Sequence, residues 1–91
     1  MSEENGEVAM NNIERIMEAL PDETFVKWDG LDAAIIGVDL KSLRLIYSVD
    51  KIYTELQKQG MTMEEAVEWY DFNVDGAYIG EKTPIHCNEL F

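Results

Sequence analysis

Acidic side chains outnumber basic ones by nineteen to seven in this chain of 91 residues, which gives a formal net charge of −12. Hydrophobic residues still make up 46% of the sequence, a proportion typical of folded rather than disordered chains. Because ionised carboxylates are costly to bury, the negative charge must lie on the surface of a folded domain. Such a surface repels phosphate backbones and anionic lipid headgroups, and it attracts basic surfaces.

The charge is concentrated at the two ends of the chain. Residues 1–30 hold eight acids and two bases, residues 31–60 hold four of each, and residues 61–91 hold seven acids and one base. If the two acidic ends pack side by side, the fold has one strongly negative face. The sequence leaves open whether they share that face.

The length predicts one domain with one modest core. The polar residues 1–7 predict a flexible acidic tail, and residues 8–91 predict a single domain. The N-terminus lacks the basic start of a signal peptide, and no apolar run is long enough to span a membrane. Cys87 is the only cysteine, so no intrachain disulfide can form. We therefore expect a cytoplasmic protein that does not contact membranes.

The first half of the chain predicts a helix followed by a hairpin. Residues 8–20 carry apolar positions at helical spacing, and Pro21 ends that pattern. The apolar run 33–38 and the alternating run 43–47 predict two paired strands. Gly37 indicates a bulge or a close backbone approach in the first of them.

The second half predicts two helices and a last strand. One helix is expected over residues 49–59, with Gly60 as its C-terminal cap. Thr62 and Glu65 form a capping box that starts the next helix, which should end near residue 72 or 73. Residues 84–87 predict an edge strand. The order α-β-β-α-α-β predicts an α+β domain with its helices packed on one face of a three-stranded antiparallel sheet.

No group of residues predicts catalysis, so we expect no enzyme, no cofactor and no metal. His86 and Cys87 are neighbours, and on a strand they point to opposite faces, where they cannot form a nucleophile–base pair. A zinc site needs more Cys and His ligands than the chain has, and no glycine-rich phosphate loop occurs. Residues 71–76 resemble the start of a calcium loop, but its twelfth position is Lys82 instead of Glu.

The helix that starts after Thr62 carries a row of acids opposite its apolar stripe. We call this row the acidic ridge; its members are Glu64, Glu68, Asp71 and, if the helix extends, Asp75. Neighbouring carboxylates at this spacing stand about 5–6 Å apart, close to the phosphate spacing of a nucleic-acid strand. No base lies between Thr62 and Gly80. The ridge is either an ordinary solvated helix face or an imitation of a phosphate backbone.

Two aromatic residues, Trp69 and Phe72, lie beside the acidic ridge in the helical projection. They either fill core volume or serve as half-exposed anchors of a protein interface. A platform for stacking nucleic-acid bases is disfavoured, because the surrounding charge has the wrong sign.

Two segments resemble small proteins encoded by tailed phages and prophages. Residues 30–38 (GLDAAIIGV) resemble a GFDEAIIGV stretch, and residues 60–84 (GMTMEEAVEWYDFNVDGAYIGEKTP) resemble GMTYEEAVEYFEFNVVGAYVGENTP. The resemblance covers about residues 28–86. It implies a viral origin and a location in the cytoplasm of a host cell. It implies no catalytic activity that could be transferred to this chain. Small acidic phage proteins are often inhibitors of host defence or transcription machinery.

Two functions remain open from the sequence. In the first, the acidic ridge replaces phosphates, with Trp69 or Phe72 as an anchor, and blocks a basic host protein that binds nucleic acid, such as a defence nuclease or a CRISPR effector. The protein itself then binds no nucleic acid. In the second, the glycine-containing residues 76–84 bind a small molecule or metabolite, in a monomer or a homo-oligomer. A strongly anionic ligand would require Lys82, Lys41 or Arg44 to converge there.

Overall fold

Helix α1 (Asn12–Ala19) is the first element of the computed structural model, which describes residues 11–89. A capping box starts it: the Asn11 side chain accepts the N–H of Glu14 at 2.9 Å, and the Glu14 side chain accepts the N–H of Asn11 at 3.1 Å. Because these bonds pair N–H groups of the first turn, α1 begins at Asn12. Residues 8–10 of the predicted helix lie outside the described residues. The predicted tail over residues 1–7 lies outside the described residues.

Strands β2 (Ile35–Asp39) and β3 (Arg44–Ser48) form the predicted antiparallel hairpin. Their pairing shifts register between Ile35 and Gly37, so the predicted bulge is confirmed. A short 3-10 helix, η1 (Asp32–Ala34), occupies the place where the first strand was expected to begin. Only Ile35 of β2 is fully buried, because β2 is an edge strand of the sheet.

Helices α2 (Val49–Lys58) and α3 (Met63–Asn73) follow. The C-cap of α2 is Gln59, and Gly60 comes directly after it with a φ of +107°. The Ser48 hydroxyl accepts the N–H of Lys51 at 3.2 Å and starts α2 directly at the end of β3. Both bonds of the predicted capping box are present in α3, with the Glu65 N–H donating to Thr62 Oγ1 and the Thr62 N–H donating to Glu65 Oε1. The predicted start and end of α3 are therefore confirmed.

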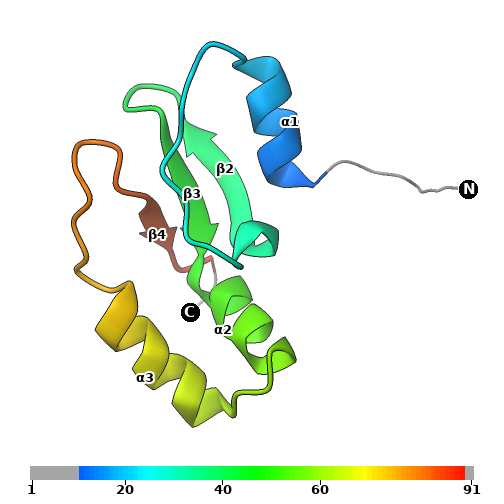
Figure 1. Cartoon of the computed structure of the whole chain (residues 1–91), viewed down its shortest axis with the longest axis vertical. Coiled ribbons are helices and arrows are strands. Elements are labelled where there is room, and N and C mark those ends of the chain that lie inside the picture. Colours follow the sequence, from blue (N-terminus) through cyan, green and yellow to red (C-terminus); the bar gives the residue numbers. More distant parts are fainter. Residues whose placement is uncertain (1–10, 90–91) are drawn as a thin grey trace, which may run out of the picture.

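Strand β4 (Ile85–Cys87) lies at the other edge of the sheet and runs parallel to β3. Ile85 pairs with Ile46, and Cys87 pairs with Ser48. The prediction of a wholly antiparallel sheet is wrong, because α2, α3 and the following loop form the long crossover that a parallel pair requires. The described residues form an α+β fold with a mixed sheet of order β2-β3-β4 (Figure 1).

The core lies where η1, β3, α2 and α3 meet. Its buried apolar side chains are Leu31, Ala34, Ile35, Leu45, Tyr47, Ile52, Leu56, Ala66, Tyr70 and Val74, together with Ile13 of α1. Helix α1 packs beside β2, whereas α2 packs mainly against α3 and η1 (Figure 1). Helix α1 therefore packs apart from α2 and α3, and the three helices do not form one layer on the sheet.

Figure 1 places α1 and α3 at opposite ends of the molecule, with the sheet and α2 between them. These two acid-rich helices consequently do not form one continuous negative face. Within residues 11–89, none of the helices has the length and apolarity needed to cross a lipid bilayer.

Candidate functional site

All four members of the acidic ridge are exposed side chains. Glu64, Glu68 and Asp71 lie within the helix, and Asp75 follows one residue after the C-cap Val74. The N–H of Asp75 donates to the carbonyl of Tyr70 at 2.8 Å, so Asp75 stays attached to the last turn of the helix. Glu64, Glu68 and Asp71 therefore keep the helical spacing of the ridge, whereas α3 does not extend to Asp75.

No lysine or arginine neutralises the ridge in the part of the chain that the structure describes. The ion pairs there join Lys27 to Asp32, Lys58 to Glu55 and Lys82 to Glu23. None involves a ridge carboxylate, so the four negative charges repel one another across a solvated surface. Mutual repulsion of this kind works against helix stability.

The helix dipole adds to this cost at one end of α3. Glu64 lies in the first turn, where a carboxylate stabilises a helix, whereas Asp71 lies near the C-terminus, where no basic residue is present. The charge pattern of α3 is therefore not the one that would best stabilise the helix.

The two aromatic residues beside the ridge lie in different environments. Trp69 is half-buried and packs against the core, whereas the Phe72 side chain is 87% exposed. Both line an open hollow next to Glu68, whose far wall is the turn of residues 59–61 between α2 and α3. Trp69 therefore matches the core-volume interpretation, and Phe72 matches the interpretation as an exposed anchor.

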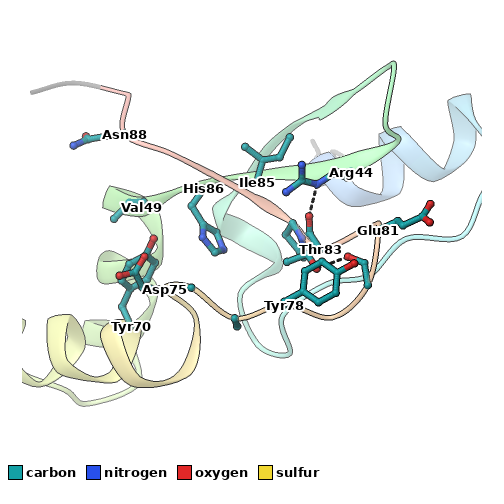
Figure 2. A pocket seen from close by; sticks show the side chains of 14 residues that line it. Arg44, Val49, Tyr70, Asp75, Tyr78, Glu81, Thr83, Ile85, His86 and Asn88 are labelled. Carbon is teal, nitrogen blue, oxygen red and sulfur yellow. Dashed lines mark hydrogen bonds between the residues drawn. The ribbon is translucent and has the colours of Figure 1, made fainter.

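A second feature is a cavity of about 720 Å³ between the loop of residues 76–84, the end of α3 and the strands β3 and β4 (Figure 2). Arg44 enters it from β3 and His86 from β4, while Tyr70 and Asp75 come from the end of α3. The glycine-containing segment singled out in the sequence forms one wall of this cavity.

Thr83 fixes the shape of that loop. Its hydroxyl accepts the N–H of Ile79 and donates to the carbonyl of Gly80, both at 2.7 Å. The carbonyl of Thr83 in turn accepts a hydrogen bond from Nε of Arg44 (Figure 2). The loop is consequently bonded both within itself and to β3.

Of the three cations considered for this region, only Arg44 lines the cavity. The Lys82 ammonium donates to the carbonyl of Thr24 at 2.8 Å, pairs with Glu23 and lies 5.8 Å from the ring centre of Phe25. Lys41 lies in the turn between β2 and β3 and is not a lining residue. A strongly anionic ligand therefore meets one cation here and not three.

His86 is half-buried at the back of the cavity. Its Nε2 accepts a hydrogen bond from the indole N–H of Trp28 at 3.0 Å, and its ring lies edge-on to Tyr70. Burial lowers the pKa of His86, and Arg44 lowers it further, whereas Asp75 acts in the opposite direction. The nitrogen that accepts from Trp28 cannot also act as a base toward Cys87.

No sequence pattern indicates this Trp28–His86 bond, because neither helical nor strand periodicity relates residues 58 positions apart. Residues 71–73 of the calcium-like run form the last turn of α3, so the run is not a loop. Across residues 11–89, no three histidine, cysteine or carboxylate side chains gather closely enough to hold a metal ion. Comparisons with protein-family models, with curated proteins and with solved structures find no match to this chain.

Proposed function

We propose that this protein binds a basic, nucleic-acid-binding protein of a host cell and blocks it by imitating a nucleic-acid strand. The observation that carries the proposal is the acidic ridge: Glu64, Glu68 and Asp71 are exposed along α3, Asp75 is exposed just beyond its end, and no cation is paired to them among the described residues. A groove that binds phosphates offers the lysines and arginines that such a line requires.

The spacing of the ridge supports the imitation. Side chains at i, i+4 and i+7 on a helix are separated by about 4.5–6 Å along its axis. A row of basic side chains that tracks a phosphate backbone can therefore contact successive ridge carboxylates in the same register. A helix is also rigid, so the carboxylates are held in line before the partner arrives.

Phe72 supplies the apolar part of the proposed interface. Fully burying a phenylalanine side chain contributes about 1.5–3 kcal/mol, and the Phe72 side chain is 87% exposed in the free protein. Exposed charges contribute mainly to association rate and specificity, so an aromatic anchor beside them provides affinity that salt does not screen.

The class of partner follows from charge and from the resemblance to phage proteins. A net charge of −12 opposes binding to nucleic acids or anionic membranes and favours a basic protein. A phage-encoded inhibitor acts in the host cytoplasm, where defence nucleases and CRISPR effectors present basic nucleic-acid grooves. We therefore propose such an enzyme as the target.

The test compares capture by two variants of equal net charge. Glu64→Lys/Glu68→Lys reverses two ridge charges, and Glu18→Lys/Asp22→Lys reverses two exposed charges near the far end of the molecule. Immobilised wild-type protein and the distant variant should both recover a basic nucleic-acid-binding protein from host lysate, and duplex nucleic acid should displace it. The ridge variant should recover none. Equal capture by the two variants would remove the proposal.

A further inference from the structure

The cavity beside the loop of residues 76–84 has opposite charges at its two sides. Arg44 enters from β3 on one side, Asp75 lies on the other, and His86 stands between them (Figure 2). Glu81 also lines the cavity, and in Figure 2 its carboxylate points outward, away from Arg44. The carboxylate of Asp75 raises the pKa of His86 and Arg44 lowers it, so both charges act on this ring. The cavity is therefore dipolar and lacks the uniform negative charge of the ridge.

We propose that this cavity binds a zwitterionic α-amino acid, with the ligand carboxylate on Arg44 and the ligand ammonium on Asp75. A chain of net charge −12 repels a plain anion, and Arg44 repels a plain cation from one side of the site. An uncharged apolar ligand would cover both charges without pairing them, which is costly. A zwitterion avoids all three penalties, because it is neutral overall and pairs with each group.

Arg44 is held in position for this role. Its Nε–H donates to the carbonyl of Thr83, which fixes the plane of the guanidinium group and leaves the terminal N–H donors for a carboxylate. The bond from Trp28 occupies Nε2 of His86, so the neutral ring carries its proton on Nδ1. That N–H is a second donor in the wall of the cavity.

The remaining lining suits a hydrocarbon side chain. Val49 and Ile85 contribute apolar surface, and Tyr78, which is 78% exposed, lies at the opening. The volume of about 720 Å³ lies within the range of small-molecule sites. A large aliphatic or aromatic amino acid therefore matches the cavity better than a small polar one.

The test is a titration followed by two-dimensional amide NMR, with L-phenylalanine and L-leucine as probes. We expect shifts at Gly76, Gly80 and His86, which line the cavity. 3-Phenylpropionate lacks the ammonium group, and 2-phenylethylamine lacks the carboxylate. Each should bind about tenfold more weakly than phenylalanine or worse, since losing one such contact costs about 1.4 kcal/mol.

Two pairs of variants separate the cavity from general charge effects. Arg44→Gln and Asp75→Asn should each weaken phenylalanine binding about tenfold or more. Lys41→Gln and Asp71→Asn make the same changes in charge at residues that do not line the cavity, and they should leave binding unchanged. Arg44→Gln also removes the bond to Thr83, so Asp75→Asn is the variant that tests recognition without releasing the loop.

The proposal would be overturned by the absence of shifts with either amino acid at about 10 mM, a concentration that detects even millimolar affinity. Equal affinity for phenylalanine and 2-phenylethylamine would also overturn it, and so would undiminished binding of phenylalanine by Asp75→Asn. The result is separable from the fate of the acidic ridge. Arg44 does not belong to the ridge, so Arg44→Gln should leave capture of a protein partner unchanged.

Discussion

The indole N–H of Trp28 donates a 3.0 Å hydrogen bond to Nε2 of His86, joining the segment before η1 to strand β4 across 58 residues of chain. The same imidazole lies edge-on to Tyr47 from β3 and to Tyr70 from α3. One side chain of a three-residue strand thus contacts groups from three other parts of the fold. The protonation state of His86 therefore bears on how firmly β4 is held.

We expect the stability of the fold to fall as pH is lowered from about 7 to about 5. An unfolded histidine takes up a proton near its ordinary pKa of 6.5, whereas burial lowers the pKa of His86 in the folded state. The unfolded chain then binds more protons within this window, and the stability present above pH 6.5 is lost below it. Asp75 reduces the effect and Arg44 increases it.

Urea unfolding at several pH values checks this expectation, with His86→Gln as the reference variant. The free energy of unfolding of the wild type should decrease relative to that of the variant as pH falls. A difference between the two proteins that stays constant over this range would contradict the prediction.

Replacing Trp28 with phenylalanine should raise the pKa of His86. The indole N–H stabilises the neutral imidazole by donating to Nε2, and phenylalanine cannot donate. An NMR titration of the single histidine measures the change directly. Trp69→Phe is the matched control, because within residues 11–89 the His86 ring is hydrogen-bonded to Trp28 and lies against the rings of Trp28, Tyr47 and Tyr70, not Trp69. An equal rise in the pKa of His86 in both variants would show that the hydrogen bond from Trp28 does not lower this pKa.

Replacing Tyr47 with phenylalanine should destabilise the fold by about 1–3 kcal/mol, since a partly buried donor then loses its acceptor. The Tyr47 hydroxyl accepts the backbone N–H of Trp28 at 2.8 Å, and burial raises the pKa of this phenol to about 12. Tyr78→Phe removes a hydroxyl from an exposed side chain and should leave the free energy of unfolding unchanged. Chemical denaturation of both variants compares them, and equal stability would refute the role of this bond.

Added salt should raise the melting temperature. The chain carries a net charge of −12, and screening weakens the repulsion between its surface carboxylates. Calorimetry or circular dichroism between low and moderate concentrations of sodium chloride measures the change. A flat or falling curve would count against charge repulsion as a cost of this fold.

Asp71→Lys should stabilise the isolated protein by about 0.3–1 kcal/mol, because it places a cation near the C-terminus of α3 and relieves repulsion along the ridge. The same variant should lose capture of the proposed basic partner. A gain in stability with unchanged capture would identify the ridge as an ordinary solvated face. Asp22→Lys gives the same change in charge away from α3 and serves as the control.

Local signals account for the parts of the fold that the sequence predicts well. The Thr62–Glu65 capping box and the β2–β3 hairpin both involve residues close together in the chain. Helical spacing likewise places Glu64, Glu68 and Asp71 on one side of α3, where they are exposed. None of these predictions required knowledge of how distant segments pack.

The parts that sequence reasoning missed depend on distant contacts. The direction of β4 is set by how α2 and α3 pack and return the chain, and no residue in Ile85–Cys87 encodes it. The different environments of Trp69 and Phe72 likewise follow from how α3 packs against the core. The Trp28–His86 bond and the charges of the cavity arise only after that packing is complete.

The parallel pairing of β4 with β3 closes the cavity across the whole α2–α3 crossover. The hairpin and the helices contain contacts that are local in sequence, whereas β4 pairs with a strand far away in the chain. We therefore expect the cavity to be the last part of the molecule to assemble. Detachment of this short edge strand opens the cavity and releases His86 together. Any molecule held there should therefore slow hydrogen exchange at the amides of Ile85–Cys87, so occupancy can be measured from the backbone of β4.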